Sequence, residues 1–359
     1  MKGDKLLIRN ASQVVTCSGF EAKRGTAMSD LHIIEDGAVV VSEGVITHVG
    51  PTKEIVRQVD PDEYLEIDAS GRALLPGFVD SHTHFIFGGY REEEFSWRLK
   101  GDSYMSIMER GGGIVNTVNA TRERDFEQLW SIGYERLDEM LDMGVTTVEG
   151  KSGYGLDFET ELMQLRVMAD LNEEHPVDVV STYLGAHAVP PEYTHQTDDY
   201  ITYMIEQAAR LKVVSADHLL HASDEGIQRL ARSGVIATLL PLTAFSLNEP
   251  YARGREMIDA GCAVALATDY NPGSCFSCSI PMLFALACIQ MKLTPEEAVT
   301  ALTINGAAAL GRANKIGSID VGKKADLILL KYPSYKFLPY NVGMNIVDTV
   351  IKDGIIYMI

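Results

Sequence analysis

The chain has 359 residues, 46% of them hydrophobic and 23% charged, as expected for a globular protein with one large domain or one large and one small domain. Its formal net charge of −19 would repel phosphate backbones and acidic lipid surfaces, so we expect no nucleic-acid partner and no membrane. An anionic small molecule would need local positive charge to bind to such a protein.

The cysteine content and the apolar stretches bear on location. The chain has five cysteines, an odd number at this length, which predicts free thiols and a cytoplasmic protein. The first residues contain no long apolar core, and stretches such as residues 234–245 fall short of the about 18 residues of a membrane span. We therefore expect neither a signal peptide nor a transmembrane helix.

Both ends of the chain are predicted to form short strands joined by tight turns. Residues 39–50 have the pattern of two strands around a Glu-Gly turn, and residues 349–357 predict a hairpin at Asp353-Gly354. Residues 1–72 and 316–359 therefore predict one small β-sandwich domain that is built from both termini.

The middle of the chain, residues 73–315, alternates helices with apolar strands. A helix predicted over residues 125–143 is followed by Gly144 and a strand from Val145, and the same order recurs before Val235 and Cys262. Residues 294–297 add a helix start with a capping box. The repetition predicts parallel βα units, and hence an α/β fold with a (β/α)8 TIM-type barrel.

His82 and His84 end the first apolar strand of the middle region. Residues two apart in a strand point to the same face, so the two imidazoles can converge on one metal ion. A bare His-x-His pair is more often two histidines in ordinary hydrogen bonds. The metal interpretation therefore depends on the residues at the ends of the other strands.

Polar residues come after the later predicted strands as well, at Tyr154, His187, His218 and Asp269. Taken singly, each is more often a structural residue, and Asp269 can be a turn or cap residue. In a (β/α)8 barrel, however, the carboxyl ends of all strands meet at one face, where these side chains would converge. Together they favour an active site.

The residue types indicate metal-assisted hydrolysis of a C–N bond. His82, His84 and Asp269 can bind a divalent cation that leaves a position open for water and makes that water a nucleophile. Asp269 can take the proton of this water and pass it to the leaving nitrogen. His187 or His218 can hydrogen-bond the oxygen that becomes negative. Asp269, His187 and His218 are the predicted catalytic residues.

Several segments carry a family resemblance. Residues 76–84 resemble the first barrel strand of the amidohydrolase superfamily, and residues 317–327 resemble its C-terminal β-domain. More specific segments resemble the imidazolonepropionase family of bacterial histidine degradation, namely residues 88–95, 109–114, 151–156, 184–191, 215–218 and 267–274. The resemblance covers nearly the whole chain. It implies hydrolysis of the cyclic amide of 4-imidazolone-5-propanoate to N-formimidoyl-L-glutamate.

The same resemblance implies the residue roles. It makes His82, His84 and Asp269 ligands of zinc or iron, and it suggests a homodimer. The substrate-contacting positions that it implies are Arg91, Tyr154, His187, Asn271, Gly273 and Ser274.

The substrate positions agree with the chemistry of a carboxylated ligand. Arg91 offers a bidentate cation, and the turn at residues 271–274 can offer backbone N–H groups and a hydroxyl. The alternative for Arg91 is a surface ion pair with one of the glutamates at residues 92–94.

The resemblance breaks between His187 and His218. Only six barrel strands can be counted, beginning near Leu74, Val145, Val179, Ser215, Val235 and Cys262. A barrel needs eight. The family has in that stretch a further metal-ligand histidine and a catalytic glutamate, which this sequence lacks.

Two explanations for the missing strands compete. Either this sequence lacks a stretch that the complete protein carries, or the protein itself is shortened. We favour the first, because the flanking motifs are intact and a barrel without two strands exposes two edges.

Two other functions stay open. One is an amidohydrolase that acts on another cyclic amide or amidine, such as a deaminase. The other, if the shortening is real, is a catalytically impaired homologue that keeps only a binding role. Arg91 with the turn at residues 271–274 favours a carboxylated substrate, and a metal content of about one ion per chain would favour a competent hydrolase.

Overall fold

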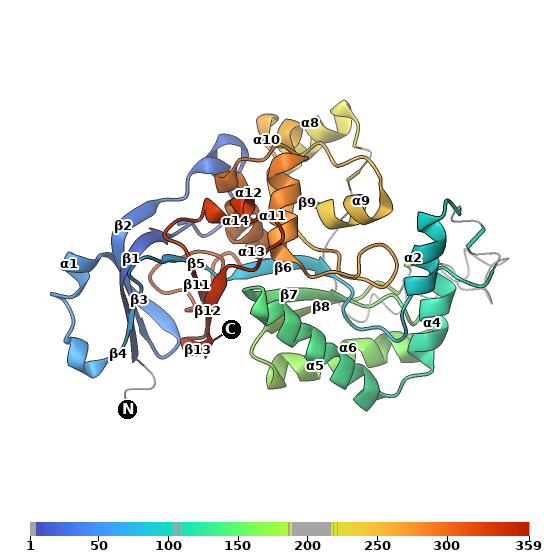
Figure 1. Ribbon diagram of the computed structural model, residues 1–359, viewed down its shortest axis with the longest axis horizontal. Helices are drawn as coiled ribbons and strands as arrows, with labels where there is room; N and C mark the ends of the chain where they lie inside the picture. The colour runs from blue at the N-terminus through green and yellow to red at the C-terminus, as the bar shows by residue number, and fades with distance from the viewer. Residues whose placement is uncertain are drawn as a thin grey trace.

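A sheet built from both ends of the chain lies beside parallel strands and helices formed by the middle (Figure 1). The computed structural model describes residues 5–102, 106–107, 110–185, 187–188, 217, 219–220 and 222–358. The architecture of this part of the chain is α/β, as the alternation of helices and strands predicted.

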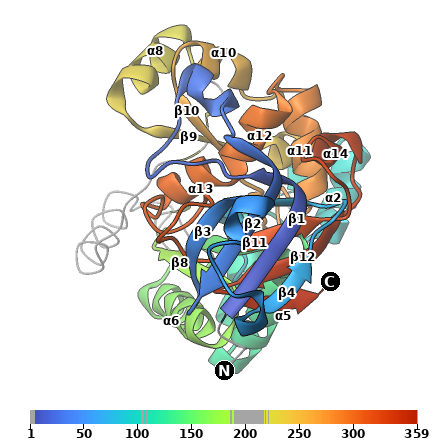
Figure 2. The same ribbon diagram turned by 90° about the vertical axis from the view of Figure 1, so that its left-hand side faces the viewer.

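Figure 2 shows strands from both ends of the chain, β1 to β3 and β11 with β12, in one composite sheet. The composite sheet has eight strands in the order β13-β12-β11-β5-β1-β2-β3, and β4 also pairs with β1. Its strands are β1 (Lys5–Val15), β2 (Ile33–Ser42), β3 (Val45–Pro51), β4 (Leu65–Asp68), β5 (Ala73–Pro76), β11 (Leu327–Leu330), β12 (Val347–Lys352) and β13 (Ile355–Met358). β5 pairs with β1 on one side and with β11 on the other, so the two ends of the chain share one hydrogen-bonded sheet.

Two tight turns of the composite sheet confirm the hairpins expected from sequence. Glu43 and Gly44 join β2 to β3 with φ angles of 52° and 74°, and Asp353 and Gly354 join β12 to β13 with φ angles of 49° and 78°. Two consecutive positive φ angles are the mark of a type I′ turn, whose twist matches that of a hairpin.

The middle region contains two groups of parallel strands, β6-β7-β8 and β9-β10. These strands are β6 (Phe78–Thr83), β7 (Val145–Lys151), β8 (Asp178–Thr182), β9 (Ile236–Leu239) and β10 (Ala263–Leu266). The apolar run from Leu74, expected as one strand, is divided: its first part is β5 of the composite sheet and its second part is β6. Both parts are fully buried, so hydrophobicity alone does not reveal the division.

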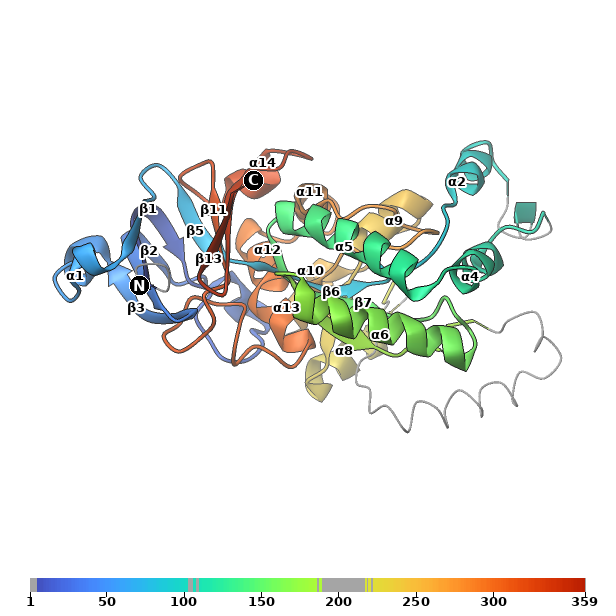
Figure 3. The same ribbon diagram turned by 90° about the horizontal axis from the view of Figure 1, so that it is seen from below.

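The helices of the middle region pack around these strands, and α5 and α6 lie along the outer face of β6-β7-β8 (Figure 3). They are α2 (Glu92–Leu99), α4 (Ile114–Arg122), α5 (Phe126–Asp142), α6 (Phe158–Glu174), α8 (Asp224–Ser233), α9 (Pro241–Leu247), α10 (Gly254–Asp259), α11 (Ile280–Ile289), α12 (Pro295–Leu302) and α13 (Ile304–Ala309). Four shorter helices, partly in the composite region, are η2 (Gly25–Ser29), α1 (Thr52–Ile55), η3 (Pro61–Glu63) and α14 (Phe337–Tyr340).

The start of α12 confirms the capping box predicted from sequence, because Thr294 caps it together with Glu297. Asp125 caps α5 in a second capping box, with Gln128, which was not predicted. In each case the side chain of the cap accepts from a backbone N–H that has no partner within the helix.

Between β8 and β9, the described residues contain no strand. The strand predicted from Ser215 lies outside the described residues, apart from 217, 219 and 220, which form no strand. In the part of the chain that the structure describes, the strands of the middle region therefore do not form a complete ring.

A cluster of ion pairs joins the composite sheet to the amino end of β8. Asp178, the first residue of β8, lies 3.2 Å from Lys324 Nζ and 3.3 Å from Lys352 Nζ. Lys352 is buried and also pairs with Asp326 at 3.0 Å. In barrel folds the amino ends of the strands contribute to stability, whereas the carboxyl ends carry the site.

All five cysteines are free, which confirms the expectation of unpaired thiols. Burial raises the pKa of Cys278 to about 12 and raises that of Cys275 as well, so both thiols of residues 275–278 stay protonated. Among the described helices, none is both long and apolar enough to cross a membrane.

Candidate active site

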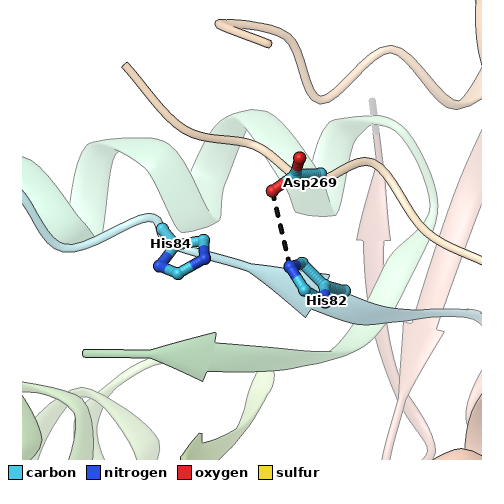
Figure 4. Close-up of side chains that lie close together, drawn as sticks. All are labelled: His82, His84 and Asp269. Carbon is cyan, nitrogen blue, oxygen red and sulfur yellow. Dashed lines mark ion pairs between the residues drawn. The ribbon is translucent and has the colours of Figure 1, made fainter. Parts of the chain in front are cut away.

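The ends of β6 and β10 bring together two imidazoles and a carboxylate. One ligand atom from each of His82, His84 and Asp269 can be chosen so that all three lie within 4.8 Å of one another (Figure 4). Each residue is only 2% exposed. Two imidazoles and one carboxylate in a buried cluster form a donor set suited to a divalent metal such as zinc, so the residues fit the metal that the sequence predicts.

A seam of hydrogen bonds between β6 and the segment after β10 sets this geometry. The Asp269 backbone N–H donates to His82 O, and the His84 N–H donates to Tyr270 O, both at 2.9 Å. Asp80 accepts from the Thr268 N–H at 3.0 Å and from Thr268 Oγ1 at 2.6 Å. We call this set of contacts the β6/β10 seam. Because the seam fixes both backbones, it also fixes the spacing of the three candidate ligand side chains.

His82 is oriented by a carboxylate on its other side. Its Nδ1 lies 2.9 Å from Asp217 Oδ2, while its Nε2 lies 3.4 Å from Asp269 Oδ1. Burial alone would lower the pKa of His82, but the hydrogen bonds to Asp217 and Asp269 outweigh it and raise the pKa to about 9. An environment that favours a proton on Nε2 also favours a bound cation, and a carboxylate behind a histidine is a common outer partner in metal sites.

Asp217 belongs to a larger buried network. Lys151 Nζ lies 2.9 Å from Asp217 Oδ2 and 2.9 Å from Glu149 Oε2. Burial works against ionisation of Asp217, but His82 and Lys151 hold its pKa below the ordinary value. Asp217 is therefore a fixed anion that keeps the ring of His82 in place.

Asp269 has an unusual backbone conformation, with φ of 54°. Aspartate tolerates this left-handed region better than most residues, but the conformation still costs free energy and is typical of functional sites. Its Oδ2 accepts from Thr243 Oγ1 at 2.7 Å. The carboxylate is thus oriented by a hydroxyl on one oxygen and faces His82 with the other.

The segment after His84 is held by Arg136 of α5. The Arg136 guanidinium donates to Phe85 O at 2.7 Å and to Phe87 O at 3.2 Å. It also lies over the ring of Phe87, 3.6 Å from the centroid. A buried cation of a covering helix therefore fixes the chain just past the second metal-ligand candidate.

Tyr154 and His187 meet His84 as a cluster of rings. The imidazoles of His84 and His187 are stacked with centroids 4.9 Å apart, and Tyr154 lies 5.4 Å from each. Since the Gly153 carbonyl can only accept, His187 Nδ1 donates to it at 3.1 Å, which directs Nε2 away from that carbonyl. Burial raises the pKa of Tyr154, so its hydroxyl stays a neutral donor.

A cavity of about 490 Å³ opens beside these rings, and its wall includes His84, Asp269, Arg91 and Asn271. Arg91 Nε pairs with Glu94 Oε2 at 2.8 Å, so the ion pair that the sequence left as an alternative does form. The guanidinium nevertheless lines the cavity and packs on Gly273, where a Cβ would lie 2.2 Å from Arg91 Nη1. Arg91 therefore forms an ion pair with Glu94 and lines the cavity at the same time.

Glu94 anchors this part of the wall. Its carboxylate also accepts from the Gly113 N–H at 3.0 Å and from Asn116 Nδ2 at 3.2 Å, and the residue is buried. Glu94 therefore positions Arg91, a role that sequence reasoning missed although the spacing of three residues on a helix was visible.

The turn at residues 271–274 uses its donors internally. The N–H groups of Gly273 and Ser274 donate to Asn271 Oδ1 at 2.9 and 2.8 Å, and Ser274 Oγ lies 2.8 Å from Asn271 Nδ2. The expectation that these groups point at a ligand is therefore not met in this arrangement, because the asparagine side chain closes an Asx turn over them.

Nearly all of the site residues predicted from sequence lie around one cavity. His82, His84, Asp269, Tyr154 and His187 come together, and Arg91, Asn271, Gly273 and Ser274 line the same cavity. His218 lies outside the described residues. Asp217, one residue before it, was not singled out from the sequence, although its place beside a histidine at a strand end was a usable signal.

Comparison with known proteins identifies the family. The amidohydrolase family matches residues 167–356, and a second amidohydrolase family matches residues 65–125. An imidazolonepropionase from Parabacteroides distasonis is 66% identical over 415 aligned positions, with 100% of both chains covered. Imidazolonepropionases from Clostridium tetani and Bacteroides fragilis are 52% and 54% identical, and each alignment covers 99% of this chain and at least 98% of the relative.

Solved structures of lower identity share the fold. An adenosine deaminase from Xanthomonas campestris with bound zinc has a TM-score of 0.69 at 20% identity, covering 99% of this chain and 93% of the other. An Escherichia coli guanine deaminase has a TM-score of 0.70 at 14% identity, covering 99% of both chains. These likenesses show that the fold of the chain is of the TIM-barrel type. The chain belongs to the amidohydrolase family and, within it, to the imidazolonepropionases.

Proposed function

We propose that this protein hydrolyses the cyclic amide C–N bond of 4-imidazolone-5-propanoate to give N-formimidoyl-L-glutamate, a step of histidine degradation. The family supports the reaction, and one structural observation carries it to this chain. The buried cluster of His82, His84 and Asp269 opens into a cavity whose wall also holds Arg91. A metal site and a carboxylate-binding cation thus share one cavity.

The metal ligands in this proposal are His82, His84 and Asp269. A bound divalent metal would supply Lewis acidity and an activated water. We favour zinc, because imidazole and carboxylate ligands suit it and a zinc-containing structure shares the fold. Iron is the other candidate, and elemental analysis of the purified protein distinguishes the two.

The catalytic roles rest on the hydrogen bonds of Asp269 and His187. Thr243 Oγ1 orients the Asp269 carboxylate, which takes a proton from the attacking water and passes it to the leaving ring nitrogen. His187, held through Nδ1 by Gly153 O, offers its other nitrogen to the oxygen that becomes negative. His218 stays a candidate for the same role.

The carboxylate of the substrate would lie at Arg91. Glu94 fixes the guanidinium through Nε, which leaves its Nη groups for a bidentate contact with a carboxylate. Tyr154 would contact the ring as a neutral donor. The turn formed by Asn271, Gly273 and Ser274 would donate hydrogen bonds to the substrate only after its internal Asx turn opens.

The composite sheet is proposed to form the small β-sandwich expected from sequence. Side chains from near the two ends of its strand order, such as Ile46 of β3 and Ile351 of β12, share one buried cluster. A single sheet whose ends share a core must curve over itself.

For the barrel, we propose that this sequence lacks about two βα units between β8 and β9. The alignment with the Parabacteroides distasonis relative runs over 415 positions and this chain has 359 residues, so at least 56 positions (415 − 359) have no residue of this chain. About 60 residues make two such units. Intact mass tests the proposal: about 6 kDa above 39.4 kDa would mean that the complete protein carries them.

We further propose a cytoplasmic location, supported by the five free thiols, and a homodimer, which the family suggests. Sedimentation of the purified protein would test the assembly, with a monomer as the contrary result. Fractionation of the source cells would test the location.

Product analysis separates the proposed reaction from deamination. Hydrolysis of the ring amide releases no ammonia and gives an acyclic glutamate derivative, whereas a deaminase releases ammonia from a cyclic amidine. Incubation with 4-imidazolone-5-propanoate should give N-formimidoyl-L-glutamate by mass spectrometry. Turnover of a neutral purine or pyrimidine in place of the imidazolone would favour the deaminase alternative.

A further inference from the structure

Arg98, near the end of α2, lines the same cavity as Arg91. Its guanidinium carbon lies 5.2 Å from the centroid of the Phe95 ring, so it is held by an aromatic face of its own helix. The sequence patterns gave no reason to choose it over other helix arginines. Two guanidinium groups thus face one cavity in a protein whose formal net charge is −19.

The two arginines differ in how their charge is balanced. Arg91 has its own counter-ion in Glu94, whereas no carboxylate of the described residues lies within ion-pair distance of Arg98. The other carboxylates of the cavity wall are Asp269, in the metal-ligand cluster, and Glu249, which is exposed. Burial, and then the nearby charge of Arg91, lower the pKa of Arg98, and the charge of Glu94 offsets part of this effect. An anion bound between the two guanidinium groups would relieve this repulsion.

A second cavity of about 630 Å³ adjoins the first. The two share Arg91, Phe95, Arg98, Gly273 and Ser274, so the arginines lie on their common border. The second cavity lacks the metal-ligand candidates and includes Tyr90, Phe245 and Phe276, whose exposed fractions are 66%, 54% and 51%. Its wall is the more apolar of the two, so it forms an apolar approach to the border.

We propose that Arg98 is a second recognition residue for the carboxylate of the substrate, placed on the border between the apolar second cavity and the cavity of the metal-ligand cluster. This inference rests on the proposed function, because it takes an anionic substrate as given. Arg91 is in direct contact with Glu94, which fixes its geometry, whereas Arg98 has no carboxylate of the described residues within ion-pair distance and adds positive charge that attracts an anion.

The test compares Arg98→Met with Lys100→Met. Both variants lose one positive charge at the same end of α2, but the exposed Lys100 lines neither cavity. The probe is 3-(imidazol-4-yl)propanoate, which keeps the carboxylate and has no amide to hydrolyse, and its Kd is measured by calorimetry. 4-Propylimidazole, which lacks the carboxylate, is the matched neutral probe, and both probes are measured at about pH 9, where an alkylimidazole ring is neutral. Arg98→Lys tests rescue by charge.

We expect Arg98→Met to raise the Kd of the propanoate by roughly tenfold or more, because an ionic hydrogen bond is lost. Lys100→Met should leave that Kd unchanged, and Arg98→Lys should restore most of the affinity. The Kd of 4-propylimidazole should not depend on Arg98. In turnover, Arg98→Met should raise KM with little effect on kcat and weaken the salt dependence of kcat/KM.

Equal Kd values for Arg98→Met and Lys100→Met would overturn the inference, as would an equal loss of affinity for the neutral probe, which indicates packing alone. If Arg98→Met does not fold, Arg98→Gln and Arg98→Lys are compared in the same assays. If the propanoate binds in an Arg98-dependent way but the imidazolone ring is not opened, the proposed function fails and the recognition role stands. If the imidazolone ring is opened at the normal rate and Arg98→Met changes neither Kd nor KM, the proposed function stands and the recognition role of Arg98 fails.

Discussion

The composite sheet and the β6/β10 seam differ in how they are held together. Each strand of the composite sheet is paired along its length, and its core mixes side chains from both ends of the chain. The seam instead depends on one isolated bridge, Thr83 to Tyr270, and on a few side-chain contacts such as Asp80 with Thr268. The sheet therefore contributes mainly stability, whereas the seam contributes the spacing of the ligand side chains.

This contrast indicates where a substitution should be felt. A change in the composite sheet should lower the free energy of unfolding while the metal and substrate sites stay intact. A change in the seam should alter metal affinity more than stability. Substitutions in the sheet, the seam and the site can separate these two roles.

The His84→Ala variant should lose most of its activity. Removing one of three ligands at a catalytic metal should lower kcat/KM by about a thousandfold or more, equivalent to ~4 kcal/mol. Metal content by elemental analysis should fall with it, while the circular dichroism spectrum stays unchanged. Full activity of the variant would contradict the assignment of His84 as a metal ligand.

In the composite sheet, Leu329→Ala should destabilise the protein by ~2–5 kcal/mol, because it leaves a cavity in a core position that is 0% exposed. Urea unfolding measures the change. Under native conditions kcat and metal content should match the wild type. If Leu329→Ala were as stable as the wild type but had lost its metal, the proposal that the sheet provides stability and the seam provides the metal site would be contradicted.

The Asp80→Ala variant weakens the β6/β10 seam and leaves the three proposed metal ligands unchanged. It removes both hydrogen bonds to Thr268 and should weaken metal affinity by roughly 10–100-fold, as other outer-shell changes do. Competition with a chelator measures the affinity. The neighbouring Ser81→Ala, also buried, serves as a control with no expected change in the seam.

Arg91→Met should raise KM by roughly tenfold or more, because a charged hydrogen bond to the carboxylate is lost. The effect on kcat should be smaller. Since Glu94 then loses its cation, the double variant with Glu94→Gln should be more stable than Arg91→Met alone. An unchanged KM would show that the Arg91–Glu94 pair is only structural.

The smallest expected effect is on the pH dependence of stability, and it comes from His175, which lies away from the candidate active site. Its Nδ1 accepts from the Val177 N–H at 3.0 Å, and burial lowers its pKa below 6.5 although Asp138 Oδ1, 3.1 Å from Nε2, favours the protonated ring. Below that pH the unfolded chain binds the proton more readily, so stability should fall as pH drops through this range. His175→Asn keeps an acceptor and should weaken that dependence in urea unfolding at about pH 7.5 and about pH 5.5, on either side of the ordinary histidine pKa.

Much of the fold and part of the site could be predicted from sequence. Hairpins at Gly44 and Gly354 and the caps at Asp125 and Thr294 obey local rules, so they were predictable. The convergence of His82, His84 and Asp269 also results from their places at strand ends, because parallel strands put those ends on one face.

The features that could not be predicted depend on contacts between distant segments. Asp80 lies inside an apolar strand, and only the position of Thr268 gives it a role. Arg98 resembles any helix arginine until two cavities are seen to meet beside it. The internal hydrogen bonds of Asn271 likewise depend on whether its Asx turn is closed, and sequence does not report that.

The catalytic metal site is tested most directly by a metal titration of activity. The protein is stripped with a chelator, Zn²⁺ is added in known equivalents, and opening of 4-imidazolone-5-propanoate is measured at each step. We expect no turnover without metal and a linear rise that ends near one equivalent per chain. Turnover that survives complete removal of metal would contradict the assignment of His82, His84 and Asp269 as the catalytic metal site.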